Sequence, residues 1–291
     1  MAEPPRRVLV TGAAGRVGRA VLGLLARQGV AASALDLRDP GDLVADRVVT
    51  GRADDPAAVR AALDGVDAVI HLAAIPAPTL GTPEEVFLGN AGGTFVVLEE
   101  AGAAGVRRAA VASSFSALGL PWAARALHPA YVPVDEALPL QVEDPYGLSK
   151  QVDEATAAMM ARRHGMTVVA LRYPLLGAPG DRLGARAADY AEDPASGARE
   201  LWTYLDTRDA ARAAWLAIVR PIEGFHVVFA TAPVTLAPQP TEDLLARFHP
   251  GVERRAPMPG RTAPVDLTAA GTLLGFAAEH LYEPVPAGEA S

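Results

Sequence analysis

The fold is decided by the stretch RVLVTGAAGRVG, which occupies residues 7–18. Its first five residues form an apolar run typical of a buried strand, and Arg16–Gln28 has the apolar spacing of a helix that Gly29 closes. Between strand and helix, glycines at positions 12, 15 and 18 would permit a tight turn, ligand approach to the backbone and close helix packing. Because free N–H groups at a helix start favour an anion, the pattern predicts a pyrophosphate site.

Short β-rich runs then alternate with Ala-rich amphipathic helices. Strands are predicted at 31–37, 47–50, 68–73, 109–114 and 167–172, and helices at 56–63, 83–104 and 145–164. Strands that alternate with helices of this length favour right-handed βαβ units. We therefore predict an α/β fold with a Rossmann-type, doubly wound parallel sheet.

The pattern changes after Tyr173. Residues 174–200 are rich in Gly, Pro, Asp and Arg, and the Pro-rich segment after Pro250 is expected to wrap the surface. Between them we expect a helix at 207–219, a strand at 226–230 and a helix at 241–248. We predict a nucleotide-binding Rossmann domain at residues 1–173 and a small C-terminal substrate-binding lobe at 174–291. The two are expected to be intertwined, with 209–231 returning to the sheet.

Composition excludes several classes of function. Of 291 residues, 50% are hydrophobic and 21% charged, and the net charge of −8 argues against a surface for nucleic acid or anionic membrane. With no cysteine, thiolate chemistry and disulfides are excluded. No His/Asp/Glu cluster has metal spacing, so we expect no metal. The polar start of the chain and the lack of a long apolar run predict a cytoplasmic protein.

Asp36 ends the second predicted strand, about 20 residues after the glycines. At that place a carboxylate accepts hydrogen bonds from the ribose hydroxyls of a dinucleotide and repels a 2′-phosphate. Asp36 therefore favours NAD over NADP. Arg38, two residues later, leaves NADP possible because its guanidinium could reach a phosphate.

Tyr146 and Lys150 lie one turn apart on the helix 145–164. A phenol is a poor base at neutral pH, but a fixed ammonium beside it favours the phenolate. The strand 109–114 ends in Ser113 and Ser114, which places hydroxyls at the carboxyl edge of the sheet, where the dinucleotide is also expected. The three elements together indicate hydride transfer with Tyr146 as acid/base.

The order of these motifs resembles that of the extended short-chain dehydrogenases/reductases, the NAD-dependent epimerase/dehydratase group. The resemblance runs over about residues 6–220 and rests on TGAAGRVG (11–18), Asp36, HLAA (71–74), Asn90, SSFSALG (113–119), YGLSK (146–150), Arg172 and Asp209. It implies that Lys150 assists Tyr146 and that Ser114, or as second choice Ser113, binds the reacting oxygen. It also implies a homodimer formed through helices 83–104 and 145–164.

On this basis the candidate residues fall into two groups. Those expected to bind the cofactor are Gly12, Ala14, Gly15, Arg16, Val17, Gly18, Asp36, Leu72, Ala73, Ala74, Asn90, Ser113, Tyr146, Lys150 and Tyr173. Those expected to bind the substrate are Ser114, Phe115, Tyr146 and Arg182.

The sequence departs from the resembled family at two places. Many relatives have an acid at the end of the third strand to contact adenine, whereas here Arg52 takes that position and Asp54 and Asp55 are displaced. The arginine at position 52 therefore puts the adenine contact in question. At the second place, Leu118 stands where many sugar epimerases have an aromatic residue.

The predicted substrate is small. Only residues 173–208 separate Arg172 from Asp209, which is little material to bind a nucleotide diphosphate. The chain resembles instead the compact, uronate-dehydrogenase-like members, which oxidise a free sugar acid. Arg182 and Arg186 could pair with a carboxylate or be solvated, and residues 120–140 are long enough to form a wall over the substrate.

Three functions remain open. The first is a net oxidoreductase acting on a uronic acid, an aldose or a similar alcohol. The second is an epimerase, dehydratase or decarboxylase, for example of nucleotide sugars, that retains NAD without net redox change. The third is a non-catalytic dinucleotide-binding regulator, against which the intact Tyr146, Lys150 and Ser114 count. His128 is expected to be a loop histidine rather than a catalytic group.

Overall fold

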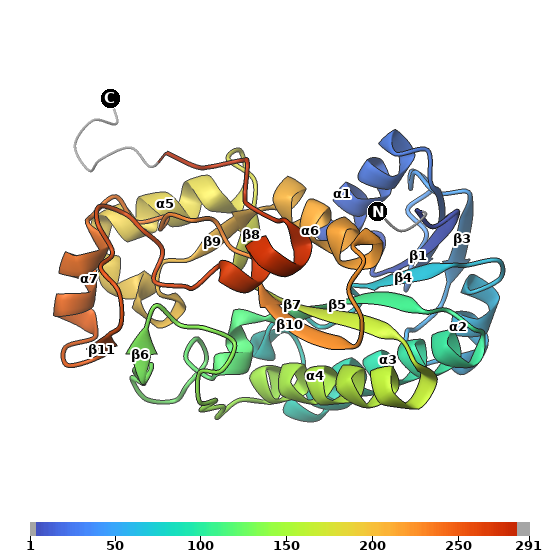
Figure 1. Ribbon diagram of the computed structural model, residues 1–291, viewed down its shortest axis with the longest axis horizontal. Helices are drawn as coiled ribbons and strands as arrows, with labels where there is room; N and C mark the ends of the chain where they lie inside the picture. The colour runs from blue at the N-terminus through green and yellow to red at the C-terminus, as the bar shows by residue number, and fades with distance from the viewer. Residues whose placement is uncertain (1–3, 284–291) are drawn as a thin grey trace.

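The computed structural model describes residues 4–283 and contains one sheet of seven parallel strands (Figure 1). The strand order is β3-β2-β1-β4-β5-β7-β10, so the chain starts in the middle of the sheet and the order reverses between β1 and β4. This is a doubly wound sheet, and the predicted Rossmann-type fold is confirmed. The strands are β1 (Arg7–Thr11), β2 (Ala31–Asp36), β3 (Arg47–Thr50), β4 (Ala68–His71), β5 (Arg108–Ser114), β7 (Thr167–Tyr173) and β10 (Phe225–Phe229).

Alternate residues along the strands face two different layers of helices. Val8 and Val10 belong to one core and Leu9 to another, as the period of two along a strand requires. In Figure 1, α1 and α6 lie above the sheet and α3 and α4 below it. The helices are α1 (Arg16–Arg27) and α6 (Thr207–Val219) on one face, and α2 (Pro56–Ala62), α3 (Pro83–Ala103) and α4 (Pro145–His164) on the other.

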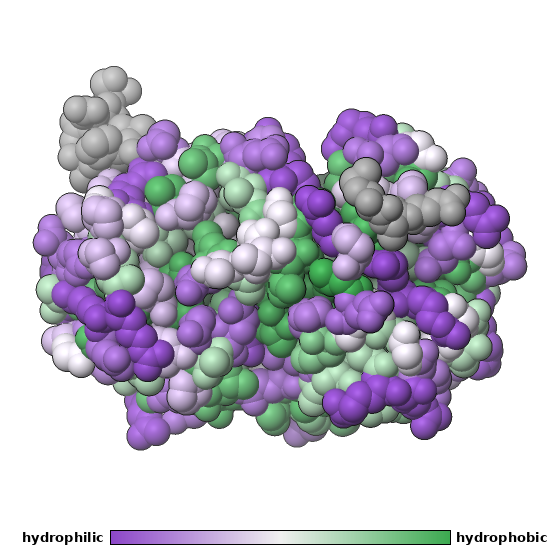
Figure 2. Space-filling model, in the orientation of Figure 1, coloured by the Kyte–Doolittle hydropathy of each residue, from purple (hydrophilic) through white to green (hydrophobic). Residues whose placement is uncertain are grey.

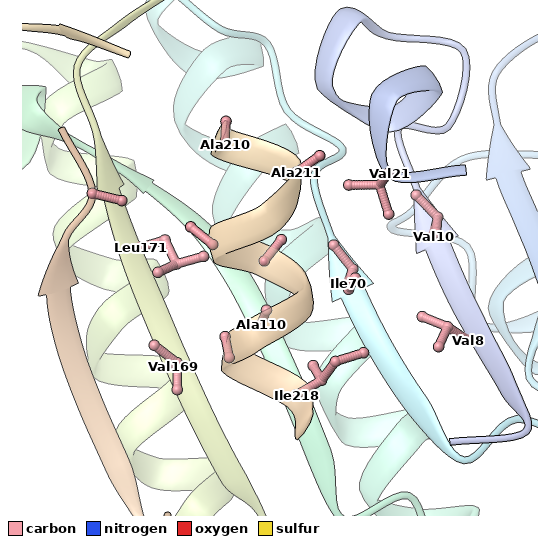
Figure 3. Close-up of a cluster of buried hydrophobic side chains, with 14 of the residues drawn as sticks. Val8, Val10, Val21, Ile70, Ala110, Val169, Leu171, Ala210, Ala211 and Ile218 are labelled. Carbon is pink, nitrogen blue, oxygen red and sulfur yellow. The ribbon is translucent and has the colours of Figure 1, made fainter. Parts of the chain in front are cut away.

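Helix α6 packs against the sheet mainly through alanines. Figure 3 shows Ala210 and Ala211 in the same cluster as Ile70, Ala110 and Leu171 from three strands. Small side chains let the helix backbone approach the strands closely, and extra methylenes there would cost about 1–3 kcal/mol. Because β10 follows α6 and pairs with β7, this part of the chain lies in the main body of the molecule.

The second lobe has a core of its own, built from two parts of the chain. Leu120 and Tyr131, which come before α4, are buried there with Tyr190, Trp202 and Met258. The lobe contains α5 (Arg182–Glu192), α7 (Thr241–Phe248), and the short strand pairs β8 (Leu175–Gly177) with β9 (Tyr204–Asp206) and β6 (Tyr131–Val132) with β11 (Glu253–Arg254). It lies to the left of the sheet in Figure 1.

The expected element boundaries differ from the observed ones by a few residues. Strand β4 ends at His71 rather than Ala73, because the N–H groups of Leu72 and Ala73 turn to the Thr11 hydroxyl at 3.2 Å. Helix α5 was not expected, because residues 174–200 were interpreted as an irregular stretch from their content of Gly, Pro, Asp and Arg. Short 3₁₀ turns are η1 (Pro78–Leu80), η2 (Phe115–Leu118) and η3 (Pro194–Glu200), and a π turn is η4 (Ala270–Leu274).

Candidate active site

A cavity of about 1030 Å³ opens along the carboxyl ends of the strands. Its walls come from the loops after β1, β2, β4 and β5, from the first turns of α4, and from the lobe. The structure brings together in this cavity all of the residues predicted as candidates from the sequence, which are Gly12, Ala14, Gly15, Arg16, Val17, Gly18, Asp36, Leu72, Ala73, Ala74, Asn90, Ser113, Ser114, Phe115, Tyr146, Lys150, Tyr173 and Arg182.

The glycine loop has the geometry that its spacing predicts. Gly12 has a φ of +66°, and a Cβ there would lie 2.7 Å from the backbone nitrogen of Ala73. A Cβ on Gly18 would lie 2.3 Å from the carbonyl oxygen of Gly12, so only glycine lets α1 pack this close to the loop. Gly15 precedes the first turn of α1 and is exposed, which leaves the helix N-terminus open to an anion.

Asp36 lies at the far end of this cavity and is bound to the same loop. Its carboxylate accepts a hydrogen bond from the Ala14 N–H at 2.8 Å. Nearby, Asp54 also lines the cavity, although it was expected to be displaced, and forms a bidentate pair with Arg52 at 2.7 Å. Asp55 has a different role: it caps α2 by accepting from the Ala57 N–H. An acid therefore does reach this end of the cavity.

The start of α4 positions Tyr146. Asp144 caps the helix by accepting from the Gly147 N–H at 2.7 Å. A Cβ on Gly147 would lie 2.6 Å from the carbonyl oxygen of Ser116, so this glycine lets the turn after β5 pack directly on the helix. As a result Tyr146, which is 8% exposed, and Ser114, which is 9% exposed, line the same cavity.

Lys150 is buried one turn along α4 from Tyr146. Its ammonium donates to the Ala112 carbonyl at 2.9 Å and to Asp153 at 3.0 Å, and it lies 5.8 Å from the centre of the Tyr146 ring. Burial alone would lower the pKa of Lys150, but the charges of Asp153 and Tyr146 outweigh it and raise that pKa above its ordinary value. The ammonium therefore stays charged at neutral pH, and one of its three N–H donors is left for a ligand.

The two serines at the end of β5 have different partners. The Ser113 hydroxyl donates to Glu154 at 2.6 Å, and Glu154 is in turn paired with Arg172 through two contacts of 2.9 Å. The Ser114 oxygen accepts from the Ser116 N–H at 3.0 Å, which leaves its proton free to be donated. Ser114 is thus the serine available to a substrate, and Arg172 forms a structural ion pair.

Asn90 and Tyr173 line the cavity but use their polar atoms within the protein. The Asn90 side chain bonds both backbone groups of Ile75 and the Ser149 hydroxyl, so it shapes the loop after β4. The Tyr173 hydroxyl donates to the Ala210 carbonyl, so this residue presents its ring to the cavity.

The part of the cavity wall next to the lobe contains residues that were not predicted. Trp122, Glu200 and Thr203 line it together with Arg182, whereas Arg186 does not reach it and pairs with Asp189. Glu200 and Thr203 lie in a segment without periodicity, so the sequence held no signal for them. Trp122 lies in the segment that was expected to form a wall.

Two further contacts of the lobe involve titratable or charged side chains. His128 is not among its lining residues and contacts His249, with 2.9 Å between their Nδ1 atoms. Arg16, at the cavity mouth, pairs with Asp181 of the lobe. Within residues 4–283, no three His, Cys, Asp or Glu side chains form a metal-binding group, and no helix is long and apolar enough to cross a membrane.

Comparisons with known proteins agree with this geometry. The NAD dependent epimerase/dehydratase family matches residues 8–228. The chain is 34% identical to an L-arabinose 1-dehydrogenase (NAD(P)(+)) of Haloferax volcanii over 57% of its length and 65% of the relative. It is 32% identical to a uronate dehydrogenase of Pseudomonas putida over 58% of its length and 60% of the relative. These alignments therefore span less than two thirds of either relative.

A solved structure extends the likeness to nearly the whole chain. A short-chain dehydrogenase/reductase superfamily protein from Agrobacterium tumefaciens with bound NAD is 27% identical, covers 94% of this chain and 93% of its own, and superposes with a TM-score of 0.71. The likeness thus includes the lobe as well as the sheet.

Proposed function

The chain belongs to the NAD-dependent epimerase/dehydratase family, and from this premise we propose that it is an oxidoreductase acting on a sugar-like alcohol. In this function a hydride moves between a carbon of the substrate and nicotinamide. One observation carries the proposal: Tyr146, Lys150 and Ser114 line the same cavity as the glycine loop. A regulator that only binds a dinucleotide would have no use for a phenol beside a buried ammonium.

The residues of the cavity fit NAD. The exposed Gly15 leaves the start of α1 accessible to a pyrophosphate, and the carboxylate of Asp36, which lines the same cavity, would accept hydrogen bonds from ribose hydroxyls. That carboxylate would repel a 2′-phosphate, so NAD is favoured over NADP. The free N–H of Lys150 is available to the nicotinamide ribose. When bound, NAD⁺ supplies the acceptor of the hydride.

The proton of the reaction passes through Tyr146. The Ser114 hydroxyl donates a hydrogen bond to the substrate oxygen and fixes its position. The Tyr146 phenolate takes the proton of the substrate hydroxyl as the C–H bond of the carbon that carries this hydroxyl breaks. The charge of Lys150 stabilises that phenolate. In the reverse direction Tyr146 returns the proton to the carbonyl oxygen.

The substrate is proposed to be a free sugar or sugar acid. The lobe segment between β7 and α6 forms only two short strands, one helix and one 3₁₀ turn, which is little material to bind a nucleotide moiety. The named activities of the relatives, on L-arabinose and on uronate, are of this size class. We also propose a main domain at residues 1–173 and a lobe at 174–291 that is intertwined with it, since α6 and β10 lie in the main body.

We further propose a homodimer formed through α3 and α4. These helices pack against each other below the sheet in Figure 1, and Figure 2 shows pale green, hydrophobic patches between hydrophilic residues in the region of α4. Leu88 and Phe95 on α3 are 63% and 46% exposed, and Leu148 on α4 is 43% exposed. Leu88 and Phe95 are two helical turns apart and therefore share one face. Large apolar side chains gathered in this way are typical of a protein interface.

The test is to incubate the protein with NAD⁺ and a panel of aldoses, uronic acids and nucleotide sugars, and to follow NADH by absorbance. We expect NADH with at least one free sugar, and its loss in Tyr146→Phe while NAD binding measured by calorimetry remains. Tyr282→Phe, outside the cavity, is the matched control and should stay active. NAD that co-purifies with the protein, with no NADH from any substrate, would support an epimerase instead.

A further inference from the structure

Two consecutive residues of the lobe adopt a backbone conformation that side chains disfavour. Leu201 and Trp202 have φ values of +50° and +54°, and neither is glycine. Both are completely buried. Residues with side chains rarely occupy this left-handed region, and when they do the surrounding structure must enforce it, often at a functional site.

The surroundings of Trp202 do enforce this turn. Its backbone N–H donates to Gly197 at 3.0 Å, its indole N–H donates to Pro194 at 2.7 Å, and its carbonyl accepts from Leu236 at 2.8 Å. A Cβ on Gly197 would lie 2.4 Å from the Trp202 ring, so a glycine is needed for the ring to pack here. The turn is therefore fixed on several sides.

The turn places Glu200 in the wall of the cavity. Glu200 and Thr203, on either side of the turn, both line the cavity. Thr203 is already engaged, since its hydroxyl donates to the Glu200 carbonyl at 2.7 Å and its N–H to the same carbonyl at 3.1 Å. The Glu200 side chain is the polar group that remains for a ligand.

One oxygen of this carboxylate is fixed and the other is free. The Tyr190 hydroxyl donates to Glu200 Oε2 at 2.8 Å, and burial raises the pKa of Tyr190, so this tyrosine stays a donor. Within residues 4–283, Oε1 has no hydrogen-bond partner. An ionised carboxylate only accepts hydrogen bonds, so its ligand must be a hydrogen-bond donor, and the hydroxyl groups of a sugar meet this requirement.

We propose that Glu200 determines substrate specificity by accepting hydrogen bonds from the hydroxyls of a neutral sugar and by disfavouring a sugar acid. This inference rests on the proposed function and names its substrate class. Arg182 lines the same cavity, whereas the nearby Arg186 pairs with Asp189 outside it. A polyhydroxylated ligand satisfies both Glu200 and Arg182 because a hydroxyl both donates and accepts. A uronate carboxylate close to Glu200 would meet like charge.

The experiment compares kcat/KM for L-arabinose and D-glucuronate in the wild type, Glu200→Gln and Tyr190→Phe. We expect the wild type to prefer the neutral sugar. In Glu200→Gln the ratio of the two kcat/KM values should fall roughly tenfold or more, mainly through KM for L-arabinose, because a charge-assisted bond is lost. Tyr190→Phe removes only the hydrogen bond that fixes the Glu200 carboxylate. It should therefore lower the ratio of the two kcat/KM values by less than Glu200→Gln does. Glu192→Gln, exposed on the same lobe outside the cavity, should leave it unchanged.

Calorimetric binding of L-arabinose to the NADH-bound protein separates this inference from the proposed function. If no sugar is oxidised, the proposed function fails, but loss of L-arabinose binding in Glu200→Gln alone still supports the role of Glu200. An unchanged ratio in an active Glu200→Gln enzyme, a wild-type preference for the uronate, or no binding of L-arabinose overturns the inference.

Discussion

The ammonium of Lys150 lies 3.0 Å from the carboxylate of Asp153, and neither side chain is more than 4% exposed. The two residues are three positions apart on α4, on the face that also carries Tyr146. The pair explains how a lysine can remain charged in a buried site. It makes Asp153 a positioning residue, since it acts on the candidate chemistry only through Lys150.

Asp153→Asn should make the enzyme sensitive to alkaline pH. The raised pKa of Lys150 contributes stability that is fully present below the ordinary lysine pKa of about 10.4 and is lost as pH rises through the folded value. Without Asp153, burial lowers that pKa, so Lys150 loses its proton at a lower pH. We expect kcat/KM to fall between pH 8 and 10 where the wild type retains it.

The same substitution should also lower stability. Removing one member of a buried ion pair leaves the other charge unpaired and costs roughly 3–5 kcal/mol, which urea unfolding at pH 7 would measure. Asp243→Asn, an exposed acid on α7, is the control and should change neither the pH profile nor the unfolding free energy appreciably. A wild-type pH profile in Asp153→Asn would contradict the role of the pair.

Substitution of one of the two neighbouring serines should lower catalytic activity, and substitution of the other should lower stability. Ser114→Ala removes the donor that faces the cavity and should lower kcat on the order of a hundredfold, with little change in melting temperature. Ser113→Ala removes a bond to Glu154 and should cost about 1–2 kcal/mol of stability while kcat is retained. Steady-state kinetics and thermal melts of both variants check this, and the reverse pattern would assign the substrate oxygen to Ser113.

Replacing each of two glycines of α1 by alanine should change the stability of the protein in opposite directions. The Cβ of Gly18→Ala would clash with the Gly12 carbonyl at 2.3 Å, and since that neighbour is backbone, the loop must shift. We expect weaker NAD binding and a loss of about 1–3 kcal/mol. The Cβ of Gly23→Ala meets only the flexible end of Arg27 at 3.6 Å, so helix propensity should stabilise this variant by up to about 1 kcal/mol. Calorimetry with NAD and thermal melts distinguish the two.

The sequence predicted the cofactor side of the site better than the substrate side, for a physical reason. Asp36 and Ser114 end their strands and Gly12 directly follows one. The carboxyl ends of parallel strands meet at one edge of the sheet, so the convergence of these residues follows from the fold. Glu200 reaches the cavity through a turn that depends on Gly197 and on the packing of Trp202. No local propensity predicts that turn.

Asp153 illustrates a different limit of prediction from the sequence. Its spacing of three from Lys150 was visible in the sequence and would have placed both residues on one face of the helix. An Asp–Lys pair at that spacing is common on exposed helices, so only the burial of both residues gives it meaning. That burial follows from the packing of α4 on the sheet.

His71 should make unfolding depend on pH in acid. Burial, with a smaller effect from the charge of Lys150, lowers the pKa of His71 to about 3, and its ring contacts the hydroxyls of Thr11 and Thr94. The unfolded chain binds a proton near pH 6.5 and the folded chain does not, so stability falls as pH drops from there toward 3, by up to about 1.4 kcal/mol per pH unit. His71→Gln should lose this slope in urea unfolding between pH 4 and 6. His226→Gln should keep it.

The exposed apolar face of α3 should be sensitive to a charged substitution. If Leu88 and Phe95 pack against a second copy of the chain, Phe95→Glu places a charge in the interface and should convert a dimer to a monomer. Light scattering after size-exclusion chromatography measures the mass directly. Because Phe95 lies outside the cavity, NADH formation per active site should persist in the monomer. Val44→Glu, which also replaces an exposed apolar side chain by a charged one but lies away from these helices, should leave the mass unchanged. A wild-type protein that elutes as a monomer would exclude this interface.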